Sequence, residues 1–197
     1  MSNSNSPYGL RPVGTMNSAS YTGKVQKFYV PADNTTAIHI GDTVEIAGTG
    51  SAQAVYAGDV LRPEVAEGTQ ADVHTLGVCV GIEPLYSDLT VNYRKASTAM
   101  YILVDTDPQT IYSVQGDSGV WTAADVHLNA NLTVTAGDNT TGRSKFVITT
   151  PTADAAKDTL IIGVDPALDN ETGAYMRFHV LLNLPQYGFG ARTVGLT

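Results

Sequence analysis

The chain has little charge and almost no cysteine. Only 15% of its 197 residues are charged, against about 25% in typical soluble domains. This low charge, together with abundant Thr, Gly, Asn and Ala, suggests that other protein covers much of the surface, although the same composition also fits a secreted β-protein. The single cysteine, Cys79, cannot form an internal disulfide and excludes a cysteine-based metal cluster. It lies in the apolar run of residues 76–82, where we expect a buried small hydrophobic residue.

Long hydrophobic runs are also absent. No stretch approaches the roughly 18 apolar residues of a membrane span, and no basic-then-apolar signal sequence opens the chain. The net charge of −8 argues against a nucleic-acid-binding body. We therefore expect neither a membrane nor a nucleic acid among the partners.

Acidic residues are missing from the first 32 positions. This stretch carries Arg11, Lys24 and Lys27, while all 19 acidic residues follow it. Its opening is rich in Ser, Asn, Gly and Pro and is too polar to bury itself. We predict that residues 1–21 form an extended N-terminal arm that contacts a neighbouring protein. The expected contact residues are Tyr8, Leu10, Arg11, Pro12, Val13, Met16, Tyr21, Lys24 and Lys27.

Apolar residues alternate with other residues along much of the remaining chain. Alternate side chains of a strand face opposite sides, so this period of two predicts half-buried strands. The clearest runs are residues 76–82 and 176–182, with shorter ones at 38–40, 44–46, 126–128, 132–134 and 146–148, and a continuous apolar run at 101–104. Turn residues separate the runs at short intervals, which favours an all-β fold, an antiparallel sandwich or barrel. We expect one β-rich domain over residues 22–187, followed by a C-terminal tail over 188–197.

Helical periodicity is nearly absent. Residues 152–158 could form one or two helical turns. Residues 60–71 are polar and contain Pro63 and Gly68, so we interpret them as a long loop or a short helix.

One short motif resembles a catalytic signature. The sequence Gly-Asp-Ser-Gly at residues 116–119 matches the nucleophile segment of trypsin-like serine proteases. Neither upstream histidine, His39 or His74, lies in the Ala-Ala-His-Cys context of those enzymes, and Val120 replaces their second glycine. We therefore expect a hairpin turn between residues 112–114 and 120–122 rather than a nucleophile at Ser118, and no enzymatic activity.

Metal-binding patterns are weak as well. The four histidines have no metal-ligand spacing and are expected on sheet faces or at interfaces; they are His39, His74, His127 and His179. Asp105 and Asp107 could bind a hard cation such as Ca²⁺, but the Asp-Pro pair at 107–108 is an ordinary turn opener. We expect a structural turn there, and no metal or other cofactor.

Three segments carry a resemblance to a known family. They are Pro-Tyr-Gly-Leu-Arg-Pro-Val at residues 7–13, Ile-Leu-Val-Asp-Thr-Asp-Pro-Gln-Thr-Ile-Tyr-Ser-Val-Gln at 102–115, and Leu-Ile-Ile-Gly-Val-Asp-Pro at 160–166 with Val-Leu-Leu-Asn at 180–183. Together they resemble the capsid cement, or decoration, proteins of tailed bacteriophages, and the similarity extends from residue 7 to about residue 187.

The resemblance implies a structural virion protein on the outer face of the capsid. Such a protein would stabilise the shell by bridging neighbouring subunits of the major capsid protein. It implies a homo-oligomer, with a trimer favoured and a dimer possible, no cofactor and no reaction. The alternative is a carbohydrate- or receptor-binding β-module of a virion fibre or surface, which would cluster exposed aromatics and amides in one set of loops.

Overall fold

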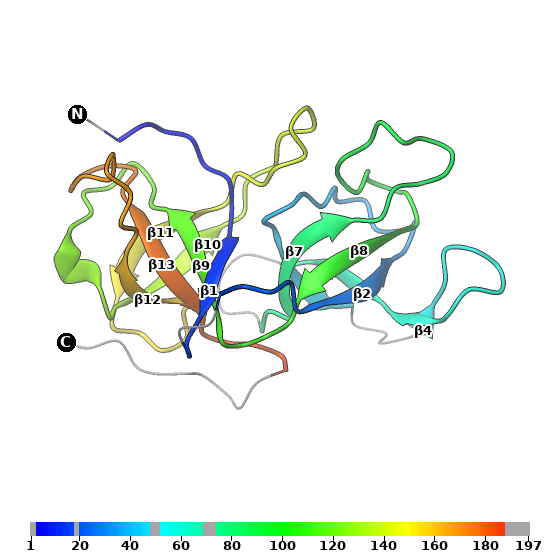
Figure 1. Ribbon diagram of the computed structural model, residues 1–197, viewed down its shortest axis with the longest axis horizontal. Coiled ribbons are helices and arrows are strands. Elements are labelled where there is room, and N and C mark those ends of the chain that lie inside the picture. The colour runs from blue at the N-terminus through cyan, green and yellow to red at the C-terminus, as the bar shows by residue number, and fades with distance from the viewer. Residues whose placement is uncertain (1–2, 18–19, 48–51, 69–73, 188–197) are drawn as a thin grey trace.

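The alternating apolar residues form short strands throughout the computed structural model, which describes residues 3–17, 20–47, 52–68 and 74–187 (Figure 1). All pairs between strands are antiparallel. The described residues contain no α-helix and a single 3-10 turn, η1 (Ala123–Asp125). The predicted all-β, antiparallel fold is confirmed.

The larger sheet has six strands, in the order β1-β9-β13-β12-β10-β11. These strands are β1 (Arg11–Thr15), β9 (Thr110–Gln115), β13 (Arg177–Leu182), β12 (Thr159–Val164), β10 (Asn129–Thr133) and β11 (Val147–Thr152). The N-terminal β1 and β11 are its two edges. Most of the sheet therefore comes from the second half of the chain, with the N-terminal segment added at one edge.

The second sheet has five strands, in the order β2-β8-β7-β3-β6. These strands are β2 (Val25–Val30), β8 (Met100–Asp105), β7 (Gly77–Ile82), β3 (Thr43–Ile46) and β6 (Val65–Glu67). A small hairpin of β4 (Ala52–Gln53) and β5 (Arg62–Pro63) extends from this half of the molecule.

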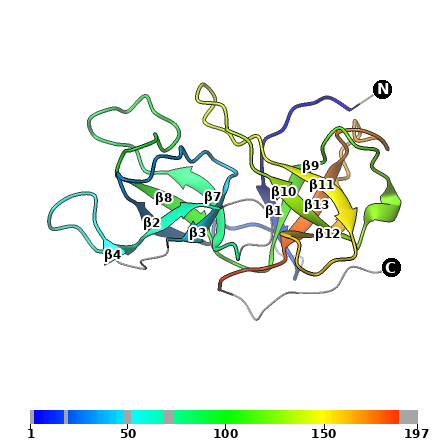
Figure 2. The ribbon, with the colours of Figure 1, turned by 180° about the vertical axis from the view of Figure 1, so that it is seen from behind.

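The two sheets lie side by side along the longest axis and form two lobes (Figures 1 and 2). Neither sheet closes on itself, so the sandwich-like arrangement is found and the barrel is not. The chain crosses from the five-stranded lobe to the six-stranded lobe between β8 and β9, at the Asp-Thr-Asp-Pro turn.

Each lobe has its own hydrophobic cluster. The cluster of the six-stranded lobe centres on Trp121 and Phe178, whose ring centroids are 5.2 Å apart. The five-stranded lobe buries Phe28, Val44 and Ile102 with their neighbours. Val78 of β7 belongs to the first cluster, although its strand lies in the second sheet. Apolar packing is therefore continuous across the junction of the lobes.

A buried arginine organises the loops of the five-stranded lobe. Arg94 is fully buried, and its guanidinium donates hydrogen bonds to the carbonyl oxygens of Pro31, Asn34, Thr36 and Thr98 at 2.5–3.0 Å. Burial lowers the pKa of Arg94 to about 10. The side chain reinforces the contact between two loops that is also made by the isolated backbone bridge of Ile38 with Arg94.

Three segments differ from the sequence-based expectations. Residues 60–71 were expected to be a loop or short helix, but they contain β5 and β6, which are too short to show a period of two. Residues 152–158 form no helix, because 152 ends β11 and the Asp154 carboxylate accepts the Ala156 N–H in a turn. Residues 120–122 do not form the expected hairpin with residues 112–114 of β9, because the Trp121 backbone pairs with Gly173 instead.

Candidate functional site

The N-terminal segment lies against the body. Arg11 and Thr15 of β1 pair with Ser113 and Thr110 of β9, and the Leu10 side chain is 1% exposed in the core of the six-stranded lobe. The expectation of an arm standing away from the body is not confirmed. The physical reason is that β9 offers unpaired backbone groups along its edge, while Leu10 gains by leaving water.

Two glycines allow this segment to cross close to the five-stranded lobe. Gly9 and Gly41 have φ of +70° and +102°, the left-handed region that favours glycine. A Cβ at Gly9 would lie 2.4 Å from the Ser144 side chain, and one at Gly41 would lie 2.7 Å from the Tyr8 carbonyl oxygen. The Leu10 N–H donates to the Gly41 carbonyl at 3.0 Å. This crossing fixes the segment at the junction of the lobes.

The expected contact residues therefore divide into two groups. Leu10 is buried, and two of the three cations are already paired: Lys24 Nζ lies 2.9 Å from Asp107 Oδ2, and Lys27 Nζ lies 2.5 Å from Glu83 Oε2. Leu10 is therefore part of the core, and the two lysines contact carboxylates of the chain itself, while their predicted contact with a partner stays a prediction. The remaining ones are exposed or half-buried: Tyr8, Arg11, Pro12, Val13, Met16 and Tyr21.

Tyr8 is held by a half-buried chain of polar side chains. Its hydroxyl lies 2.8 Å from Ser113 Oγ, which donates to Asp165 Oδ2 at 2.6 Å. His179 Nε2 lies 3.8 Å from the same carboxylate oxygen. Burial raises the pKa of Asp165, but the hydrogen bonds from Ser113 and the Ala167 N–H outweigh it, and the pKa is lowered.

This set contains a serine, an aspartate and a histidine, but it is not connected as a catalytic triad. The serine donates to the carboxylate, whereas a triad needs the serine bonded to the histidine. Its evident effect is to orient Tyr8. Sequence reasoning missed it because Ser113 and Asp165 are 52 positions apart.

Ser118 lies exposed in a tight turn. Asp117 Oδ1 accepts hydrogen bonds from the Gly119 N–H at 2.9 Å and from Trp121 Nε1 at 3.0 Å. The motif lies in a turn that Asp117 closes, but the expected hairpin is wrong, because β9 pairs with β1 and β13 and Trp121 pairs with Gly173.

A second polar cluster lies at the junction, around His39. The His39 N–H donates to Asp42 Oδ2 at 2.6 Å, and its Nε2 lies 2.9 Å from Asn139 Oδ1 of the loop between β10 and β11. Its ring stacks on the ring of Tyr93, with the two ring centroids 5.0 Å apart. Burial lowers the pKa of His39, but hydrogen bonds to Asp42 and Asn139 outweigh it and raise the pKa. The histidine expected on a sheet face thus links the two lobes.

Glu67 adjoins this cluster from β6. Burial, with the nearby Asp42 carboxylate, raises the pKa of Glu67 from 4.5 to about 7. The cluster therefore changes its protonation near neutral pH.

Two further predictions, the burial of Cys79 and the turn at Asp105 and Asp107, are confirmed. Cys79 is fully buried, and burial raises the pKa of its thiol, which disfavours the reactive thiolate. Asp105 accepts the Asp107 N–H at 3.0 Å, and Asp107 accepts the Gln109 N–H at 2.9 Å. These carboxylates form the expected turn, which connects the two sheets.

Within the described ranges, no three His, Cys, Asp or Glu side chains gather in a way that could hold a metal ion. In the same ranges, no helix has the length and hydropathy needed to cross a membrane.

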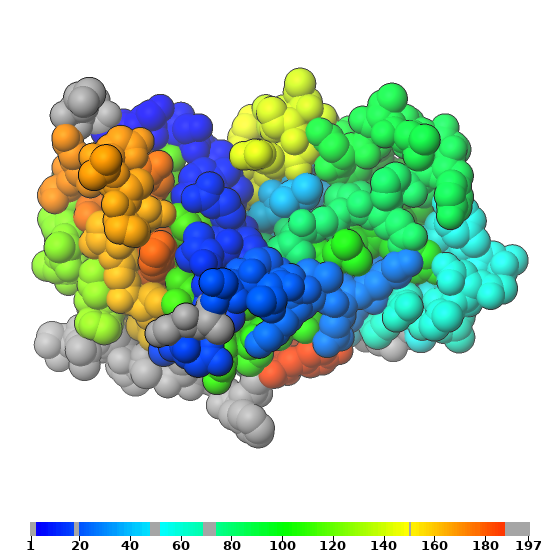
Figure 3. Space-filling model, in the orientation of Figure 1, coloured from blue at the N-terminus to red at the C-terminus, as the bar shows by residue number. Residues whose placement is uncertain are grey.

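Large apolar side chains are exposed at both ends of the longest axis. At the end of the five-stranded lobe, the loops around residues 54–61 (cyan) and 83–99 (green) carry them; at the opposite end, the turn after β9 and the loop after β12 do so (Figures 1 and 3). Tyr86 is 84% exposed, Val120 85% and Leu168 fully exposed. The residues on these loops are Tyr56, Val60, Leu61, Tyr86 and Leu89 at one end, and Val120 and Leu168 at the other. Five further large apolar side chains are exposed on other parts of the described chain: Val13, Met16, Val25, Ile40 and Tyr187. We call these the two end patches.

Sequence reasoning missed the end patches because isolated apolar residues in turns carry no periodic signal. Single exposed apolar residues are common on protein surfaces. The fold, however, places the loops that carry these residues at the two ends of the molecule. Comparison of the chain with protein-family models, curated proteins and solved structures found no match.

Proposed function

We propose that this chain is a structural virion protein of a tailed bacteriophage. It binds the outer face of the capsid and stabilises the shell by bridging neighbouring subunits of the major capsid protein. The observation that carries the proposal is the presence of exposed apolar loops at both ends of a two-lobed body.

The two end patches suit a bridging role. A molecule that touches two neighbours through separate contacts gains affinity because the second contact forms at high effective concentration. Binding only to the assembled shell then stabilises that shell by mass action. Apolar side chains on loops that connect the strands supply contact area without needing a large, preformed groove.

The wider features of the chain agree with this role. Low charge suits a protein covered by other protein, and the sequence resemblance implies a homo-oligomer on the shell, a trimer or a dimer. The major capsid protein would be the partner, and no cofactor is involved.

One contact favours a second candidate, a carbohydrate- or receptor-binding module. Tyr56 and Tyr86 are exposed, and their ring centroids lie 5.6 Å apart in neighbouring loops. Exposed tyrosines are common at recognition surfaces. Binding on a glycan array that is lost in Tyr86→Ala would favour this candidate over the capsid role.

Co-sedimentation with purified shells that lack the chain tests the capsid role. The variants are Leu89→Asp and Leu168→Asp, one in each end patch, and the control is Gln26→Asp on the exposed face of β2. We expect each end variant to bind about tenfold more weakly and to lose the protection of shells against heat, because bridging needs both ends. The control should bind and protect like the wild type. Full protection by the double variant would contradict the proposal.

A further inference from the structure

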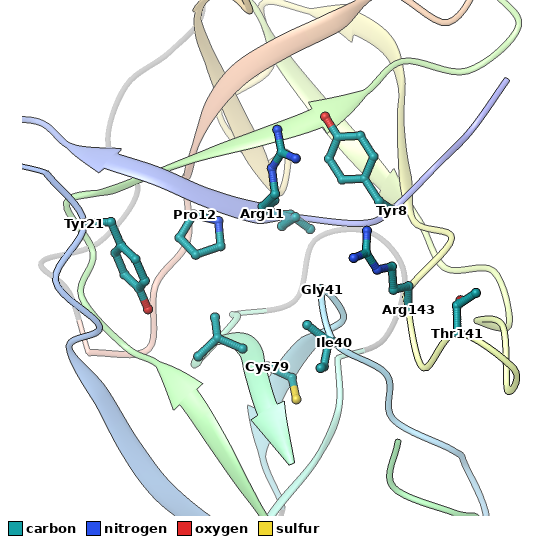
Figure 4. Close-up of a pocket in the computed structure, with 11 residues that line it drawn as sticks. Tyr8, Arg11, Pro12, Tyr21, Ile40, Gly41, Cys79, Thr141 and Arg143 are labelled. Carbon is teal, nitrogen blue, oxygen red and sulfur yellow. The ribbon is translucent and has the colours of Figure 1, made fainter. Parts of the chain in front are cut away.

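Two hollows adjoin each other along the N-terminal segment. The first, of about 460 Å³, lies between this segment and residues 40–41 and 79–80 of the five-stranded lobe (Figure 4). The second, of about 610 Å³, lies between residues 6–8 and the loop at 138–145. Tyr8, Thr141 and Arg143 line both. The shared residues make the two hollows one continuous groove at the junction of the lobes.

The groove is cationic, although the chain is acidic. Its lining contains Arg11, Arg143 and Lys145, against a single carboxylate, Asp138. The chain as a whole has a net charge of −8. Among the described residues, neither Arg11 nor Arg143 is within ion-pair distance of a carboxylate, and both side chains are exposed. They therefore differ from Lys24 and Lys27, which are paired.

The backbone beneath these cations is fixed. Arg11 belongs to β1, and its guanidinium carbon lies 5.0 Å from the centroid of the Tyr8 ring, which the Ser113–Asp165 chain holds in place. Arg143 pairs with Ile40, and its carbonyl oxygen accepts the Asp138 N–H at 2.8 Å. A site whose cations stand on fixed backbone loses less entropy when it binds a ligand.

We infer that this groove binds a short, extended, acidic segment of a partner protein, with its carboxylates on Arg11, Arg143 and Lys145. The inference rests on the proposed function and names the chemistry of the partner segment. The guanidinium presents paired N–H donors that match a carboxylate, and the face of Tyr8 supplies contact area between the charges. Electrostatic complementarity of this kind fixes orientation on a partner as well as affinity.

A protein segment suits the groove better than a nucleic acid does. Nucleic-acid affinity depends on many phosphate contacts, whereas the groove offers three cations on a chain whose net charge is −8. Three cations can hold a few carboxylates, whereas a long polyanion would be repelled by the negative charge of the whole chain.

Fluorescence anisotropy with a labelled hexaglutamate peptide tests the inference at low salt. The variant is Arg11→Ala/Arg143→Ala, with each single change measured as well, and the matched control is Arg62→Ala/Lys95→Ala, which removes two cations outside the groove. We expect the dissociation constant to rise at least about tenfold in the groove variant and to change less than about twofold in the control. Thermal melting should show both variants folded, since Arg11 and Arg143 are exposed.

Three outcomes would overturn the inference. They are an absence of saturable peptide binding, equal loss of binding in the two double variants, and tighter binding of a single-stranded DNA hexamer than of hexaglutamate. The assay contains no shells, so its result is separate from the proposed function. If the protein binds the peptide but fails to attach to shells, the inference about the groove is supported and the proposed capsid role is contradicted.

Discussion

Folding changes the charge state of Glu67 between mildly acidic and neutral pH. Its carboxyl is partly buried in β6 near Asp42, and its pKa in the folded protein is about 7 instead of 4.5. Between these values the folded state keeps a proton that the unfolded state has released. The contribution of Glu67 to the free energy of unfolding is therefore fully present below pH 4.5 and declines as the pH rises to about 7. The raised pKa of His39 acts in the same direction.

Glu67→Gln should remove much of this pH dependence. The neutral amide cannot ionise in the cluster, so the variant should become more stable than the wild type at pH 8, by about 1–2 kcal/mol after allowance for solvent screening. Urea denaturation at pH 5 and pH 8 measures the difference. Glu171→Gln, at an exposed carboxyl in the other lobe, is the control and should follow the wild type. Parallel stability curves for Glu67→Gln and the wild type would contradict the assignment.

For single residues, the sequence predicts only those features that neighbouring residues in the chain determine. The burial of Cys79 and the turn at Asp105 and Asp107 could be predicted because neighbouring residues determine them. The role of His39 could not, because Asn139 and Glu67 reach it from distant segments. For the same reason, the sequence could not predict that Lys24 pairs with Asp107, which lies 83 positions away.

Among the elements, β1 differs most from its expectation. Residues without hydrophobic period were expected to form an arm, yet they complete the edge of the six-stranded sheet. An edge strand needs only backbone pairing and one anchoring side chain, here Leu10, and neither gives a periodic pattern. The long strands β7, β8 and β13 were predictable because each alternates or is apolar throughout. The two-residue strands β4 and β5 are too short to carry any such signal.

Leu10→Ala should show that this segment belongs to the folded body. The side chain is buried in the main cluster, so truncation should lower the free energy of unfolding by about 2–4 kcal/mol. Met16→Ala, one position beyond β1 and 52% exposed, should change it by less than about 0.5 kcal/mol. Denaturant unfolding followed by tryptophan fluorescence measures both, since Trp121 lies in the same cluster. Equal stability of Leu10→Ala and the wild type would show that the segment does not contribute to the core.

At the scale of the whole molecule, the two-lobed form gives the chain two separated ends and a central groove. The end patches provide apolar contact area, and the groove provides positive charge on a chain whose net charge is negative. The all-β class was predictable from the period of two and the turn residues. The arrangement of the sheets was not, because strand order depends on contacts between segments far apart in the sequence.

Cryo-electron microscopy of virus particles that carry this chain would show whether the molecule bridges two subunits of the shell, as we propose. We expect density for both lobes on the outer surface of the head, with the two end patches touching different capsid subunits. Density that is absent from the head, or confined to the tail or a fibre tip, would contradict the bridging role.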